Sequence, residues 1–283
     1  MDESREMRIK EEVRAEYARR ITGDSACCGQ SSGQRTAPGP TGKTARKIGY
    51  TDQELASLPG DVAESSFGCG NPLAFSEVRE GEVVLDLGSG AGMDVILAAR
   101  KVGEKGKIIG LDMTPEMVET ARQNAERAGV ENVVDFRLGE IEDMPVDDDS
   151  VDWIISNCVI NLSPNKEAVF KEAYRVLKPG GKVLVSDLVS SNLPQELRKD
   201  FESWAGCVAG TLEESEYLDV IERAGFKEVF VVDKADFTDA VLQKASIKTI
   251  TDPANPPKLY SVKVRATKPH GAGNTEPARS GPG

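Results

Sequence analysis

Short apolar runs alternate along the chain with segments in which apolar residues recur every three or four positions. Five such runs predict strands: one beginning at Val83, then 107–112, 133–138, 151–156 and 182–187. The helical spacing is clearest over 115–129 and 164–177. Strands that alternate with helices favour an α/β fold with a parallel sheet. Two later runs, 226–232 and 259–265, predict the last two strands, paired antiparallel.

The segments around this pattern are more polar. Residues 2–20 predict a charged amphipathic helix, largely solvated and packed loosely on the domain. Residues 22–46 are rich in Gly, Ser, Thr and Pro, which predicts a mobile loop. Two capping boxes are expected, with Thr51 and Glu54 starting a helix over 51–64, and Thr211 and Glu214 starting another over 213–224.

The first strand ends near Asp86 and leads into alternating glycines, Gly88-Ser89-Gly90-Ala91-Gly92. Such a turn brings bare backbone and a helix N-terminus close to a ligand, which indicates a small-molecule cofactor site. Asp112 ends the next strand, where an acid suits a ribose diol. NAD and S-adenosylmethionine both carry that ribose. The dinucleotide fingerprint requires glycine at the position of Met93, so NAD is disfavoured.

These motifs, with Leu177-Lys178-Pro179-Gly180-Gly181-Lys182, resemble the Rossmann-like S-adenosylmethionine methyltransferases over roughly positions 80 to 187. The resemblance implies an α/β, Rossmann-like sheet that is mostly parallel, with the last strand antiparallel and helices on both faces. It implies S-adenosylmethionine as the cofactor and places Glu140 and Ile141 near its adenine. The residues implied to bind the cofactor are Asp86, Gly88, Ser89, Gly90, Gly92, Asp112, Met113, Glu140, Ile141 and Asn157.

Composition narrows the classes of partner. The 283 residues carry a net charge of −12, which disfavours nucleic acid and anionic membranes. No apolar run approaches the roughly 20 residues of a membrane span, and the charged N-terminus lacks a signal-peptide core, so we expect a cytoplasmic protein. The single histidine, His270, lies in a polar tail, which disfavours imidazole catalysis and histidine metal sites.

The cysteines offer another chemistry. Cys69, Cys158 and Cys207 each lie in a loop or at a strand end beside Gly or Asn. The sequence contains no C-x-x-C pair, which makes a zinc knuckle improbable. Cys158 follows the fourth strand, at the edge where open α/β sheets bind ligands. If the other two converge there, the site holds three thiols with no imidazole or carboxylate. A fourth ligand would favour tetrahedral zinc, whereas three thiolates suit As(III), whose lone pair attacks a methyl carbon without a general base.

Four segments narrow the resemblance to the arsenite methyltransferases, over about residues 22 to 266: Gly68-Cys69-Gly70, Ser156-Asn157-Cys158-Val159, Asn161-Leu162-Ser163 and Gly206-Cys207-Val208-Ala209-Gly210. In that family three cysteines hold As(III), which implies this role for Cys69, Cys158 and Cys207. A further N-terminal cysteine closes a transient disulfide with the residue matching Cys69. The adjacent Cys27 and Cys28 match this position, and the sequence does not show which of them forms the disulfide.

The resemblance implies arsenic detoxification by methyl transfer to arsenite and to methylated trivalent arsenicals. It also implies a thiol reductant, thioredoxin or glutathione, and we expect a monomer. The expected division is an N-terminal helix and Cys-containing loop over 1–48, a cofactor-binding domain over 49–190, a substrate-binding part with the last strands over 191–268 and a disordered tail over 269–283. The alternatives are a methyltransferase for a small organic acceptor such as a quinone precursor, a metalloid-sequestering protein without turnover and, last, a dehydrogenase.

Overall fold

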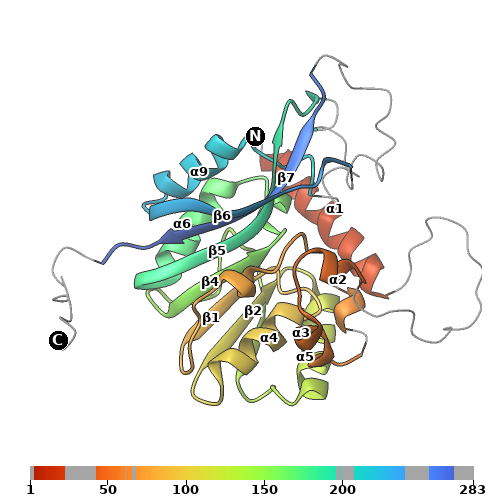
Figure 1. Cartoon of the computed structure of the whole chain (residues 1–283), viewed down its shortest axis with the longest axis vertical. Coiled ribbons are helices and arrows are strands. Elements are labelled where there is room, and N and C mark those ends of the chain that lie inside the picture. Colours follow the sequence, from red (N-terminus) through yellow and green to blue (C-terminus); the bar gives the residue numbers. More distant parts are fainter. Residues whose placement is uncertain are drawn as a thin grey trace, which may run out of the picture.

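A seven-stranded sheet of order β3-β2-β1-β4-β5-β7-β6 forms the centre of the protein (Figure 1). The computed structural model describes residues 3–22, 43–60, 62–65, 68–195, 198, 207–239 and 255–270. The strands are β1 Val83–Leu87, β2 Lys107–Asp112, β3 Val134–Leu138, β4 Val151–Asn157, β5 Leu177–Ser191, β6 Lys227–Asp236 and β7 Lys258–Thr267. Strands β1 to β5 pair in parallel, and β7 runs antiparallel to β5 and β6. The predicted Rossmann-like sheet is confirmed.

Helices cover both faces of the sheet and bury a separate apolar core on each (Figure 1). On one face lie α4 Met93–Val102 and α5 Pro115–Ala128, and on the other lie α6 Lys166–Val176 and α9 Glu214–Arg223. The remaining helices are α1 Glu3–Thr22, α2 Lys43–Lys47, α3 Asp52–Ala56 and the 3-10 helices η1 Val62–Ser65, η2 Pro72–Phe75 and η3 Ile160–Leu162. Among the described residues, no helix is long and apolar enough to cross a membrane.

The two predicted capping boxes have different outcomes. Thr51 and Glu54 form theirs at the start of α3, although the helix ends at Ala56, and a separate turn, η1, follows beyond Pro59. The capping box predicted at Thr211 does not form, because the N-cap of α9 is Glu213. The Thr211 hydroxyl donates instead to the Ser190 hydroxyl at 2.6 Å, because β5 extends to Ser191 and brings Ser190 beside it.

The strand register brings the predicted ligand-binding residues to one edge of the sheet. Leu87 pairs with Leu111 and Ser156, and Asn157 pairs with Ser186. The carboxyl ends of β1, β2 and β4 therefore lie side by side. The chain connects β1 to β2 in one direction and reaches β4 in the other, so β1 and β4 flank the point where the strand order reverses. Open α/β sheets bind their ligands at such a point.

Candidate active site

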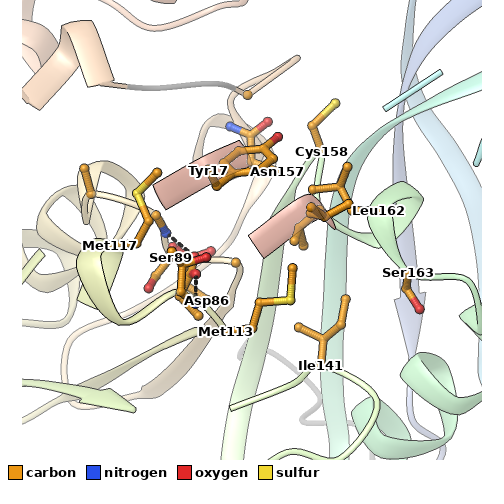
Figure 2. A pocket seen from close by; sticks show the side chains of 18 of the residues that line it. Tyr17, Asp86, Ser89, Met113, Met117, Ile141, Asn157, Cys158, Leu162 and Ser163 are labelled. Carbon is orange, nitrogen blue, oxygen red and sulfur yellow. Dashed lines mark hydrogen bonds between the residues drawn. The ribbon is translucent and has the colours of Figure 1, made fainter. Parts of the chain in front are cut away.

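An open cavity lies at this carboxyl edge (Figure 2). It encloses about 980 Å³ together with its mouth, a size typical of small-molecule sites. In Figure 2, Asp86 and Ser89 lie on one side of the cavity and Cys158 and Leu162 on the other. The turn after β1, the end of β2, the segment after β3 and the segment after β4 therefore share one space.

The glycine turn fits closely under the segment after β4. Gly88 and Gly90 have positive φ angles of 67° and 50°. Residues other than glycine adopt such angles only at an energetic cost. A Cβ at Gly88 would overlap the side chain of Val159. The Gly90 backbone N–H donates to the Asp112 carboxylate at 2.9 Å, and Thr114 N–H donates to the other oxygen at 2.9 Å. The turn and the acid that ends β2 are thus one unit.

The polar groups of this unit fit a polar, cationic ligand. The hydroxyl oxygen of Ser89 is buried and has no hydrogen-bond partner among the described residues. Asp86, Asp94 and Asp112 all line the cavity, and none of them forms an ion pair within the described residues. Burial raises the pKa of Asp94 to about 6, and burial with repulsion from Asp94 and Asp112 raises the pKa of Asp86 well above its usual range. A cation in the cavity would relieve this repulsion.

Asn157, the last residue of β4, holds the loop that carries Cys69. Its Oδ1 accepts from Cys69 N–H at 3.0 Å and from Gly70 N–H at 3.2 Å, and its Nδ2 donates to the Gly70 carbonyl at 2.6 Å. Nδ2 also donates to Asp94 at 3.2 Å, and the Tyr50 hydroxyl donates to Asp94 at 2.7 Å. One amide therefore connects the Cys69 loop to an acid that lines the cavity.

Glycine is required on both sides of Cys69 because the loop lies against the strand ends. A Cβ at Gly68 would overlap the Asn157 side chain, and a Cβ at Gly70 would overlap the Ser186 hydroxyl of β5. The Gly-Cys-Gly sequence thus allows the Cys69 backbone to approach the sheet edge closely.

Three buried thiols meet around Cys158, which also lines the cavity. Hydrogen bonds with the Cys207 and Cys69 thiols raise the pKa of Cys158 well above its usual range. The Cys207 thiol also donates to the Cys158 carbonyl at 2.9 Å. Cys158 and Cys207 have φ angles of 63° and 62°, a backbone region that is uncommon for side chains and often marks functional sites. Sequence positions 69, 158 and 207 are thereby brought together.

The expectation of a thiol site without a carboxylate is wrong. The Cys69 and Cys158 sulfurs and a carboxylate oxygen of Asp187 lie within 4.8 Å of one another. Asp187 belongs to β5, is fully buried, and has a pKa that burial raises to about 7. No sequence pattern indicated this role, because Asp187 resembles an ordinary end of a buried strand and lies far from Cys69 along the chain.

Comparisons with known proteins agree with this geometry. A family model described as a methyltransferase domain matches residues 79–225. The structure resembles an arsenic (III) S-adenosylmethionine methyltransferase from Chlamydomonas reinhardtii with a TM-score of 0.66 and 36% identity, covering 83% of this chain and 76% of that one. This chain belongs to the arsenite methyltransferase family.

Arsenite methyltransferases of other organisms are longer than this chain. That of Halobacterium salinarum is 42% identical over 250 residues, which cover 88% of this chain and 60% of the relative. The human arsenite methyltransferase is 38% identical over 193 residues, covering 65% of this chain and 51% of the relative. The matched part therefore spans about half to three fifths of the length of these curated relatives.

Most of the cofactor residues implied by the methyltransferase resemblance line the cavity: Asp86, Gly88, Ser89, Gly90, Asp112, Met113, Ile141 and Asn157. Two lie outside the lining. Gly92 caps the N-terminus of α4, and Glu140 is held by α1, where Lys10 pairs with it at 2.6 Å and Arg14 at 3.5 Å. Cys27 and Cys28 lie outside the described residues.

Helix α1 contributes to the cavity lining, so its expected loose packing is wrong. Val13 is fully buried, and Lys10, Val13 and Tyr17 line the cavity. Burial and the neighbouring Cys207 thiol raise the pKa of Tyr17 well above its usual range. The spacing of Ile9, Val13 and Tyr17 was the available signal, but the charged residues around it favoured a solvated helix.

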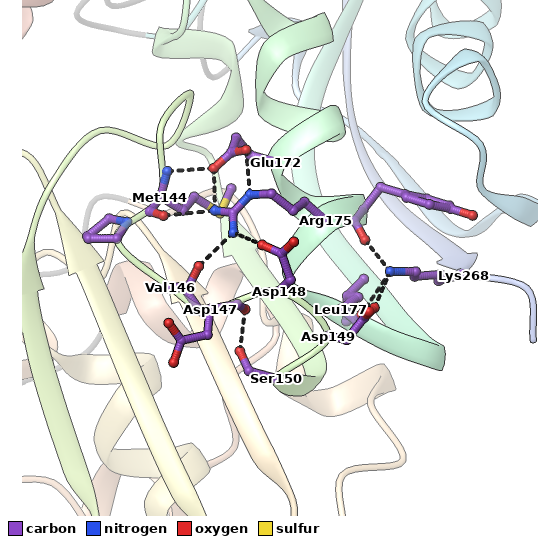
Figure 3. A network of polar contacts seen from close by, with 12 residues as sticks. Met144, Val146, Asp147, Asp148, Asp149, Ser150, Glu172, Arg175, Leu177 and Lys268 are labelled. Atoms are coloured by element: carbon purple, nitrogen blue, oxygen red, sulfur yellow. Dashed lines mark hydrogen bonds and ion pairs between the residues drawn. The ribbon is translucent and has the colours of Figure 1, made fainter. Parts of the chain in front are cut away.

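Arg175 of α6 holds the connection between β3 and β4, which contributes Ile141 to the cavity lining, and Figure 3 shows its polar contacts. Its guanidinium donates to the carbonyls of Met144 at 2.9 Å and Val146 at 2.8 Å, and it pairs with Glu172 and Asp148 at 2.6 Å each. This network ties the connection between β3 and β4 to α6, and so holds Ile141 at the cavity.

Proposed function

We propose that this protein transfers methyl groups from S-adenosylmethionine to trivalent arsenic held by Cys69, Cys158 and Cys207. The observation that carries the proposal is the position of Cys158. Its thiol contacts the other two thiols and lines the same cavity as the glycine turn and Asp112. A soft metalloid on the thiols would thus face the space that suits the cofactor.

The residues around the turn fit S-adenosylmethionine, which supplies an electrophilic methyl group on a positively charged sulfonium. Asp112, fixed by the N–H groups of Gly90 and Thr114, is placed to accept from the ribose hydroxyls. The unpartnered Ser89 hydroxyl offers a further polar contact. Asp86 and Asp94 are carboxyl groups in a cavity that would receive a sulfonium and an ammonium group, and such cations favour their ionised forms.

The thiols bind and orient the arsenic substrate. Three thiols displace three hydroxyls of arsenous acid as water, leaving a pyramidal As(III) with its lone pair opposite the sulfurs. The lone pair forms the As–C bond while the methyl–sulfur bond breaks, and no proton leaves the arsenic in this step. The chain therefore needs no general base, and alignment of the three atoms contributes much of the rate.

Methyl transfer raises arsenic formally to the pentavalent state, and two electrons are required to return it to As(III). We propose that the thiols of Cys69 and of Cys27 or Cys28 supply them, closing a disulfide that thioredoxin or glutathione reopens. Methylated trivalent arsenicals are then further acceptors. We also propose a monomer with a cytoplasmic location, without nucleic acid or membrane partners, for which the net charge of −12 is unfavourable.

The test is formation of S-adenosylhomocysteine by the purified, reduced chain, with and without arsenite, beside a direct arsenite titration. The proposal predicts product only when arsenite is present. Saturable arsenite binding without product would indicate a sequestering protein. Cofactor binding with neither arsenite binding nor product would overturn the proposal and favour an organic acceptor.

A further inference from the structure

Asp187 adds an oxygen donor to the thiol cluster. One of its carboxylate oxygens and the sulfurs of Cys69 and Cys158 all lie within 4.8 Å of one another, and all three residues are buried. As(III) with three thiolates leaves no role for this carboxylate. A buried carboxylate, 0% exposed, is costly unless it is hydrogen-bonded, paired with a cation or bound to a metal ion.

The carboxylate is held in a fixed orientation toward the thiols. One oxygen accepts from Leu188 N–H at 3.0 Å. The other accepts from Asn161 N–H at 3.1 Å and from the Tyr217 hydroxyl at 3.1 Å. Hydrogen bonds of this kind orient a metal-ligating carboxylate. Asp187 is therefore preorganised as a ligand rather than as a mobile acid.

The donor set matches a borderline divalent cation. Zinc binds cysteine sulfur and carboxylate oxygen in tetrahedral sites, and sites with three protein ligands leave the fourth position to water. The third thiol, that of Cys207, donates to the Cys158 carbonyl at 2.9 Å besides contacting the Cys158 thiol. Cys207 also lies outside the group of three ligand atoms that share the 4.8 Å distance.

The charges balance around such an ion. Two thiolates and one carboxylate carry three negative charges, and a divalent cation leaves one. The buried Lys166 lies close enough for its charge to act on Asp187, and it donates to the Ser163 carbonyl at 3.1 Å. With Lys166 the site is neutral, which lowers the cost of burying the ion. Cys158 lines the cavity, which provides a route of entry.

We propose that Cys69, Cys158 and Asp187 form a binding site for one zinc-class divalent cation when no arsenic is bound. Binding releases the two thiol protons to solvent and forms two metal–sulfur bonds and one metal–oxygen bond. The ion occupies two of the thiols assigned to arsenic and so inhibits methyl transfer competitively. The inhibition rests on the proposed function, whereas the cation site does not.

The test is a Zn²⁺ titration of the full, reduced chain against a chromophoric chelator, followed by X-ray absorption spectroscopy of the zinc-loaded protein. One ion per chain is expected, with sulfur near 2.3 Å and at least one oxygen near 2.0 Å, both approximate ligand distances. No binding, or a first shell of sulfur alone, would overturn the proposal. The wild-type spectrum decides this even if a variant at Asp187 does not fold.

Two matched variants separate the cation from arsenic. Asp187→Asn is expected to weaken Zn²⁺ binding at least about tenfold and to change arsenite binding less than about threefold, because As(III) uses thiols alone. Cys207→Ser is expected to do the reverse. Equal weakening of both ligands by Asp187→Asn would place the carboxylate in the arsenic site and contradict the proposal. Absence of S-adenosylhomocysteine formation would leave the zinc result standing and refute only the proposed function.

Discussion

The Oδ1 atom of Asn157 accepts a hydrogen bond from the backbone N–H of Cys69 at 3.0 Å, across 88 positions of sequence. Asn157 ends β4 and is followed directly by Cys158. The side-chain amide of Asn157 therefore helps to set the distance between the thiols of Cys69 and Cys158, because it precedes one of them in the chain and binds the backbone of the other. The same amide reaches Asp94 in the cavity wall.

Replacing Asn157 with Ala should release the Cys69 loop. Two backbone N–H groups and the Gly70 carbonyl lose a partner. Because each unsatisfied buried group costs about 1–3 kcal/mol, we expect the free energy of unfolding to fall by about 2–4 kcal/mol and arsenite affinity to fall at least about tenfold. Urea unfolding and an arsenite titration measure the two effects.

Asn165→Ala is the matched control. Asn165 caps α6 through the Ala168 N–H at 3.1 Å and does not line the cavity. Its loss should cost about 1 kcal/mol of stability and leave arsenite affinity unchanged. If Asn157→Ala bound arsenite as tightly as this control, the loop would not depend on the amide.

Gly70→Ala should damage the thiol cluster through its backbone. The added Cβ would overlap the Ser186 hydroxyl, so the loop must move away from β5. We expect arsenite binding to weaken strongly. Gly60→Ala is the control, since a Cβ there meets nothing within 4 Å, and stability should change by less than about 1 kcal/mol. Arsenite binding by Gly70→Ala equal to that of Gly60→Ala would show that the close approach is unnecessary.

Much of the fold could be predicted from local pattern. The range 107–112 matches β2 because a continuous apolar run that ends in an acid permits few other assignments. The start of β5 could not be predicted. Pro179, Gly180 and Gly181 suggest a loop, yet Leu177 already pairs with Val151, with a register irregularity that absorbs the change. Such irregular pairing is decided by the neighbouring strand and not by the residues themselves.

The ionisation of Asp94 should make stability depend on pH. Burial raises its pKa from 3.8 to about 6 in the folded protein, so the native state binds this proton more tightly than the unfolded chain. The contribution is therefore fully present below about pH 4 and is lost as the pH rises through about 6. Relative to Asp94→Asn, which keeps the side chain neutral, the wild type should lose about 1–3 kcal/mol between pH 4 and 7. A stability difference that is constant over this range would contradict the assignment.

Removing the Arg175 guanidinium should destabilise the fold more than removing an exposed ion pair. Arg175→Ala leaves the carbonyls of Met144 and Val146 without their donor and breaks two carboxylate contacts. We expect a loss of about 2–4 kcal/mol. Arg223→Ala removes one exposed pair with Glu167 at 3.3 Å and should cost less than about 1 kcal/mol. Thermal and urea unfolding compare the two. Equal losses would show that the Arg175 network adds nothing to the fold.

The candidate site was only partly predictable, because some of its residues are brought together by tertiary contacts, as the start of β5 is. Cys158 could be placed at the sheet edge because it follows a clear strand, and the glycine turn carries its own signature. Asp187 carries no such signal, and the helical spacing that includes Tyr17 did not show that its helix faces the cavity. Their positions beside the thiols result from strand order and from the packing of α1 across the cavity, which depend on contacts between segments more than 100 residues apart.

The most direct measurement is chromatography with arsenic detection after reaction of the full chain with S-adenosylmethionine, arsenite and a thiol reductant. We expect methylated arsenic from the wild type and none from Cys158→Ser, with cofactor binding retained by both. Only unmethylated arsenite in the wild-type reaction, or equal product from Cys158→Ser, would rule out methyl transfer to arsenic held by the thiol cluster.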